Sequence, residues 1–109
     1  MKIVLHFRQI TLGDLKYDNG MYIYNSYEQG EREFASYLSY GLYGLQGSVN
    51  KASKELFSVF FDMVKNIRQR RDILNSAHIE DNDHDYVVLL KYGRLAQCQD
   101  KFWIEVKEW

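Results

Sequence analysis

The chain has 109 residues, of which 46% are hydrophobic and 16% aromatic, and this composition predicts one folded domain over 1–109 instead of a disordered segment. Its 14 basic and 15 acidic residues give a formal net charge of −1, so no overall charge draws it to nucleic acids or membranes. The longest apolar run, 86–90, is far shorter than the roughly 20 residues that cross a bilayer. The single cysteine, Cys98, excludes an internal disulfide and fits a cytoplasmic protein.

The first part of the chain predicts three strands. Residues 2–7 alternate apolar and polar side chains with the period of two that is typical of a strand. Further strands are expected over 10–17 and 21–27, where residues that favour sheets are frequent. The Asp-Asn-Gly segment at 18–20 predicts a tight hairpin turn, because Asn and Gly accept the positive φ that such turns require. Together these segments predict an antiparallel meander.

The segment after the meander has no clear period. Residues 31–37 are expected to form a short helix, and 37–47 an irregular loop or edge, because its glycines and tyrosines recur every three residues. Tyrosine is favoured at protein interfaces, since a rigid apolar ring ends in a hydroxyl group. The candidate partner-binding residues are therefore Tyr37, Tyr40, Leu42 and Tyr43. The alternative, in which these rings cover the sheet of their own chain, stays open from sequence alone.

The densest apolar segment, 56–64, predicts the helix around which the domain is built. Large apolar residues at 56, 57, 60, 61, 64 and 67 have the spacing of one broad helix face. Ser53 is the expected N-cap, which places the helix start at 53 or 54. A break or kink is expected at Lys65 and Asn66, because asparagine competes for backbone hydrogen bonds.

The last part of the chain predicts a connection, a short apolar segment and a strand. Residues 78–85 are acidic, and 86–91 form an apolar segment for which Gly93 is the expected C-cap. Apolar side chains alternate with polar or aromatic ones over 101–109, which predicts a final strand. Strands, then helices, then a strand predict an α+β class, with an antiparallel sheet packed against two central helices.

No catalytic motif is present. The chain has no G-x-S-x-G segment, P-loop or kinase motif, so we expect no catalytic residue and no cofactor. Asp81, Asp83 and Asp85 match the first three ligand positions of a calcium loop. Tyr86 and Tyr92 stand where that loop needs Gly and Glu, however, so a solvated acidic loop is expected and no metal site.

Two further features are candidates for binding. Arg68, Arg70 and Arg71 form a basic cluster suited to an anionic partner, and their use by a small nucleic-acid-binding protein is the alternative to the function inferred below. Asp72 lies beside the cluster in the sequence and the net charge is negative, so direct nucleic-acid binding is not the expected function. Trp103 alternates against the apolar residues of the final strand, which makes it a candidate exposed anchor.

Several segments resemble one family. Residues 12–15 (LGDL) and 22–27 (YIYNSY) are similar to the "G-x-L … G-x-x-x-F-x-Y" opening of the N-terminal subdomain of HipA-type serine/threonine kinase toxins. Residues 56–62 (LFSVFFD) resemble the family's "F-x-x-F-F-D-x-L-L-P" helix, and 89–94 (LLKYGR) its "L-L-x-x-x-G-R-D" segment. The family's Leu-Pro elements are absent from this chain.

The resemblance implies a non-catalytic role. In these kinases the subdomain packs on the kinase core and contributes to contacts with a helix-turn-helix antitoxin. A free-standing copy resembles the small subunit of three-component HipBST-type systems, which binds a separately encoded kinase toxin and restrains it. The expected function is therefore that of a bacterial toxin–antitoxin component that binds a HipA-like kinase, with no membrane partner.

Overall fold

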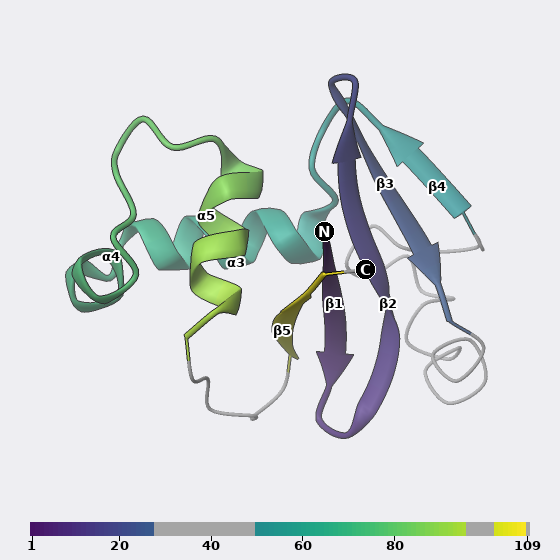
Figure 1. Ribbon diagram of the computed structural model, residues 1–109, viewed down its shortest axis with the longest axis horizontal. Helices are drawn as coiled ribbons and strands as arrows, with labels where there is room; N and C mark the ends of the chain where they lie inside the picture. The colour runs from purple at the N-terminus through teal and green to yellow at the C-terminus, as the bar shows by residue number, and fades with distance from the viewer. Residues whose placement is uncertain (28–49, 96–101, 109) are drawn as a thin grey trace.

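The computed structural model describes residues 1–27, 50–95 and 102–108, and in these residues a five-stranded antiparallel sheet packs against helices (Figure 1). The elements are β1 (Lys2–Phe7), β2 (Ile10–Asp18), β3 (Met21–Ser26), β4 (Asn50–Ser53), α3 (Ser58–Arg68), α4 (Arg71–Ser76), α5 (Asp85–Gly93) and β5 (Phe102–Lys107). The strand order is β4-β3-β2-β1-β5. The predicted α+β class is confirmed, with three described helices where two were expected. None of these helices is long and apolar enough to cross a membrane.

The predicted meander is confirmed in β1, β2 and β3. In the antiparallel register Ile3 lies opposite Leu15, and Leu15 lies opposite Tyr24. The hairpin turn after β2 has φ values of 51° at Asn19 and 78° at Gly20, as the sequence predicts. Gly13 is required where β2 meets β3, because a side chain there would collide with the backbone carbonyl of Asn25 and with the ring of Tyr24.

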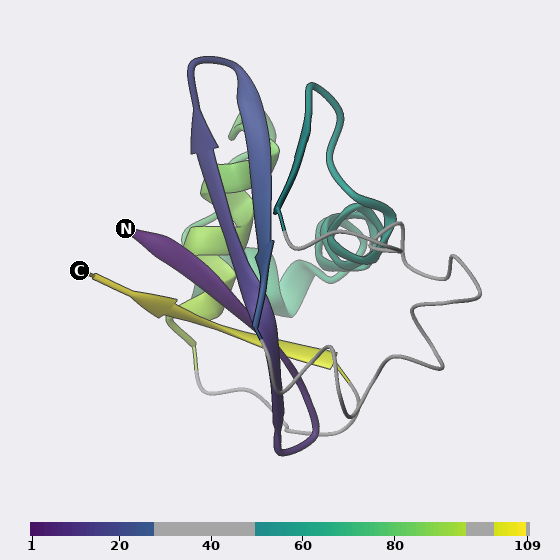
Figure 2. The same cartoon turned by 90° about the vertical axis from the view of Figure 1, so that its right-hand side faces the viewer.

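The final strand is confirmed, and it lies beside the first. β5 pairs antiparallel with β1, so that Leu5 lies opposite Ile104 and Lys2 opposite Lys107. The start of β1 and the end of β5 consequently lie side by side at this edge of the sheet (Figure 2). The opposite edge of the sheet is formed by β4, a strand that was not expected from the sequence.

The helices begin and end at residues other than those expected. α3 begins at Ser58 with Phe57 as its N-cap, so the prediction of Ser53 as the N-cap was wrong. Ser53 ends β4 instead, and its Oγ accepts a hydrogen bond from the backbone N–H of Glu55 at 3.1 Å. The break expected at Lys65 and Asn66 lies later in the chain: α3 continues to Arg68, and Gln69 and Arg70 separate it from α4, so only the position of the break was wrong.

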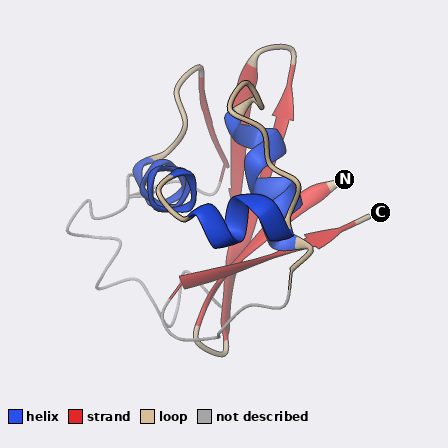
Figure 3. Cartoon of the chain, turned by 90° about the vertical axis from the view of Figure 1, so that its left-hand side faces the viewer, coloured by secondary structure: helices blue, strands red, loops and turns tan. Residues whose placement is uncertain are grey.

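The core lies between the sheet and the helices, which cover one face of it (Figure 3). Its fully buried members include Ile3, Leu5 and Leu15 from the sheet and Phe60 from α3. Phe61, which was expected on the same helix face, is 49% exposed. Successive residues of an α-helix point about 100° apart, so burying Phe60 turns Phe61 away from the sheet.

The predicted C-cap, Gly93, is the last residue of α5, and Arg94 is the cap. The short helix expected at 31–37 and the loop expected at 37–47 lie outside the described residues.

Candidate functional site

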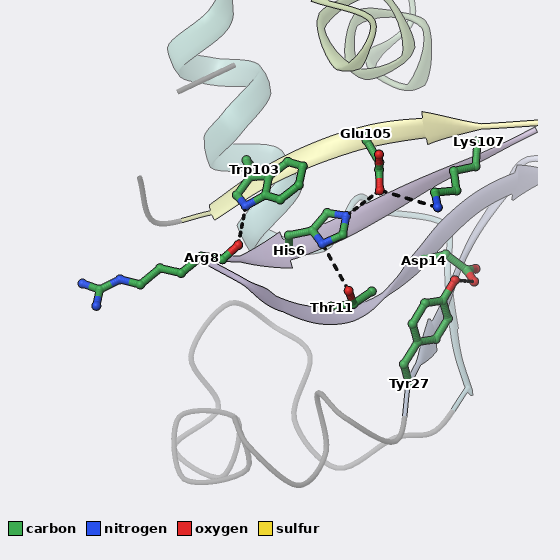
Figure 4. Close-up of polar contacts among 8 residues, drawn as sticks. All are labelled: His6, Arg8, Thr11, Asp14, Tyr27, Trp103, Glu105 and Lys107. Carbon is green, nitrogen blue, oxygen red and sulfur yellow. Dashed lines mark hydrogen bonds and ion pairs between the residues drawn. The ribbon is translucent and has the colours of Figure 1, made fainter. Parts of the chain in front are cut away.

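The face of the sheet opposite the helices, called the polar face below, carries a network of side chains from β1, β2 and β5 (Figure 4). The Nε2–H of His6 donates to Oε1 of Glu105 at 2.9 Å, and the hydroxyl of Thr11 lies 3.3 Å from Nδ1 of His6. The ammonium of Lys107 lies 3.8 Å from the same Glu105 oxygen. His6 is only 8% exposed, and both of its ring nitrogens have a polar neighbour, so the ring is fixed in position.

Trp103 is held in the same network. Its ring stacks on His6 with centroids 3.9 Å apart and an interplanar angle of 10°. The indole N–H donates to the backbone carbonyl of Arg8 at 2.7 Å, as Figure 4 shows. The predicted anchor residue is therefore half-buried and already engaged within the chain, since its polar tip has a partner.

A second group of polar contacts on this face involves the buried carboxylate of Asp14. Asp14 is 2% exposed, and its Oδ2 accepts a hydrogen bond from the Tyr27 hydroxyl at 2.7 Å and lies 3.8 Å from the Lys2 ammonium. Its Oδ1 is buried and has no hydrogen-bond partner among the described residues. Burial, together with the hydrogen bond to Asp14, raises the pKa of Tyr27 above its usual value. The sequence analysis did not single out this pair, because nothing local distinguishes one strand aspartate.

The basic cluster is divided among different partners. Arg68 donates to the backbone carbonyl of Asp83 at 2.7 Å and to Oδ1 of Asp85 at 3.0 Å. Arg70 pairs with both carboxylate oxygens of its neighbour Asp72, at 3.2 and 3.0 Å. Arg71 is exposed at the start of α4. The guanidinium groups of Arg68 and Arg70 are thus committed to carboxylates of their own chain.

The acidic segment 78–85 is fixed by the same kind of contact. Lys91 donates to Oδ2 of Asp83 at 2.6 Å and to the backbone carbonyl of His78 at 2.9 Å. The backbone N–H of Glu80 and then Lys91 lower the pKa of Asp83 below its usual value. Much of the segment is exposed, as expected of a solvated loop, but it is held in place. Within the part of the chain that the structure describes, no group of acidic, His or Cys residues is arranged to hold a metal ion.

A groove of about 570 Å³ lies where the end of β4 meets the starts of α3 and α5. It is lined by Tyr22, Lys54, Glu55, Leu56, Ser58, Phe61 and Asp85. Phe61 is the most exposed of the large hydrophobic side chains among the described residues. The sequence analysis missed this groove because it assigned Phe61 to the core.

Comparison of the chain with models of protein families, with curated proteins and with solved structures gives no match. The predicted partner-binding residues Tyr37, Tyr40, Leu42 and Tyr43 lie outside the described residues, so their placement stays a prediction. The structure does not bring Trp103 and the arginines together: Trp103 belongs to the polar face, whereas Arg68 ends α3, Arg70 lies between α3 and α4, and Arg71 begins α4.

Proposed function

We propose that the chain is a non-catalytic protein-binding module that couples to, or restrains, a separately encoded HipA-like kinase. The observation that carries this proposal is the exposure of Phe61 beside the groove. Phe61 belongs to the Phe-Phe-Asp segment that resembles the kinase family, and of its two phenylalanines only Phe60 is used in the core. A phenylalanine that the fold exposes is suited to contact a partner, because aromatic residues are enriched at interfaces.

The positions of the family-like segments in the fold also support the proposal. The segments that resemble the family fall on β2, β3, α3 and α5, which form the centre of the described fold. They supply core residues such as Leu15, Tyr24 and Phe60, as expected of a subdomain whose shared motifs are mainly structural. A helix-turn-helix antitoxin is part of the same proposal as a further contact of the assembled complex.

Co-purification of the chain with the product of the neighbouring gene, which the proposal expects to be a HipA-like kinase, tests the proposal. We expect a stable complex, and we expect Phe61→Ala, Tyr40→Ala and Tyr43→Ala to weaken it, because loss of an aromatic hot spot costs at least about 2 kcal/mol, or roughly thirtyfold in affinity. Gln69→Ala is the matched control, since this exposed residue lies just after the same helix. Absence of binding by the wild-type chain would overturn the function, whereas normal binding by the folded variants would overturn only the contact residues.

The nucleic-acid alternative has a separate test. Arg68 and Arg70 are engaged with carboxylates, so the cluster presents less free positive charge than its sequence suggests. We therefore expect no retention of duplex DNA in a low-salt gel assay, and no change on charge reversal of Arg68, Arg70 and Arg71. Clear retention that weakens steeply with salt would favour the alternative over the kinase partner.

A further inference from the structure

The groove beside Phe61 combines an uncovered aromatic ring with acidic groups. Phe61 lies on α3 and is 49% exposed, and it shares the lining with Glu55 and Asp85. Leu56 adds apolar surface, and Lys54 is the cation among the lining residues that the structure describes. The groove is therefore lined by an aromatic ring and two carboxylates, from α3, the start of α5 and the connection between β4 and α3 (Figure 1 shows these elements).

Both carboxylates keep oxygen atoms available for a partner. Asp85 uses Oδ1 to accept from Arg68, and its Oδ2 has no hydrogen bond among the described residues. The side chain of Glu55 likewise has no described partner, because the hydrogen bond of this residue to Ser53 uses its backbone N–H. Burial and then the charge of Asp85 raise the pKa of the Tyr22 hydroxyl to about 12, so the field of Asp85 reaches the groove lining.

We infer that this groove binds an arginine side chain presented by a partner protein. A guanidinium group stacks on an aromatic face and donates two parallel hydrogen bonds to one carboxylate, and the groove offers both kinds of contact. Glu55 is the main acceptor because its side chain has no partner among the described residues, while Asp85, whose Oδ1 already pairs with Arg68, adds Oδ2 as a second acceptor. Lysine fits less well, since its ammonium is more strongly hydrated and lacks the planar fork.

The chemistry of the lining excludes some other occupants. A phosphate group would face two carboxylates and one ammonium, so a nucleic acid is disfavoured. A purely apolar side chain would cover Phe61 but would leave the carboxylate of Glu55 without a partner. An arginine offers both an apolar stem with a planar group for the ring of Phe61 and hydrogen-bond donors for a carboxylate, so it matches this lining better. The inference rests on the proposed function only in taking the partner to be a protein.

The test uses the whole chain and short peptides, observed by NMR of the 15N-labelled protein. The probes are three blocked pentaglycine peptides whose central residue is arginine, lysine or citrulline, the last being the neutral counterpart of arginine. The arginine peptide should shift the backbone amide signals of Glu55, Phe61 and Asp85, with weaker shifts for lysine and none for citrulline. Glu55→Gln and Phe61→Ala should each weaken binding about threefold, the loss expected for one exposed ion-pair or cation–π contact.

Glu108→Gln is the matched control, because Glu108 is an exposed carboxylate near the other end of the chain and pairs with Arg94. This variant should bind the arginine peptide like the wild type. Equal shifts with arginine and citrulline, or unchanged binding by both groove variants, would overturn the inference. Concentration-dependent shifts at the groove without peptide would also overturn it, since a second copy of the chain would then be the occupant. Failure of kinase co-purification with the peptide result intact would overturn only the proposed function.

Discussion

On its helix-covered face the sheet buries Ile3, Leu5 and Leu15 to 0% exposure, whereas on its polar face it buries Asp14 to 2% and His6 to 8%. The first face is stabilised by removal of apolar area from water, a term that depends little on the geometry of any single contact. The second depends on specific donors and acceptors, since a buried polar group is costly when it lacks a partner. The same alternating strands thus carry two kinds of stabilisation, and mutations should distinguish them.

Truncation at the helix-covered face should have the largest effect. Phe60 is 0% exposed, so Phe60→Ala should lower the free energy of unfolding by about 3 to 5 kcal/mol, from lost burial and the cavity that remains. The neighbouring Phe61→Ala should change it by about 0.5 kcal/mol or less, because half of that side chain is in solvent. Urea unfolding of the two variants measures the difference. Similar losses in both variants would show that α3 does not bury Phe60 while leaving Phe61 exposed.

On the polar face the expected losses are smaller, and they should be coupled. Asp14→Ala leaves the Tyr27 hydroxyl without its acceptor and the Lys2 ammonium without its nearest carboxylate. We expect a loss of about 1 to 3 kcal/mol, the typical cost of leaving a buried hydrogen-bonding group unpaired. The double variant Asp14→Ala with Tyr27→Phe should lose less than the sum of the single losses, because both remove the same hydrogen bond. Strict additivity in urea unfolding would mean that the pair does not interact.

The sequence predicts the helix-covered face better than the polar face, and the reason is physical. The alternation over 2–7 and the turn at Asn19 and Gly20 are local patterns, and the structure confirms both. His6 and Glu105 are 99 residues apart, and Arg68 and Asp85 are 17 apart, so no local pattern indicates that they meet. Such pairs follow from strand order and helix packing, which a single sequence does not specify.

Errors in the helical part have a different origin. Ser53 was expected to cap a helix, and its hydroxyl does accept a nearby backbone N–H, but in the turn that follows β4. A serine side chain makes this kind of hydrogen bond in helix caps and in turns alike. The sequence therefore indicates the hydrogen bond but does not show which of the two structures contains it. Asn66 remains helical because its side chain lies on the exposed side of α3. The groove was missed because Phe60 and Phe61 point about 100° apart on α3, and the sequence alone does not specify which of the two faces the sheet.

The smallest expected effect concerns alkaline pH. Burial raises the pKa of Tyr22 and of Tyr86 to about 12, and on the polar face burial and the Asp14 hydrogen bond raise that of Tyr27 above its usual value. In the unfolded chain tyrosines lose their protons near about pH 10. Above that pH the unfolded state binds fewer protons than the native state, so the free energy of unfolding falls as pH rises.

Tyr27→Phe isolates the contribution of the polar face. Near pH 8 the wild type should be more stable than this variant by about 1 kcal/mol, the usual net value of one hydrogen bond. As pH rises from about 8 to 11 the difference should shrink, because only the wild type has this proton to lose on unfolding. Urea midpoints of both proteins across this range measure the trend, and lysine ionisation cancels because both share the same lysines. A difference that stays constant would show that Tyr27 ionises alike in the folded and unfolded chain, and that its hydrogen bond to Asp14 does not hold the proton.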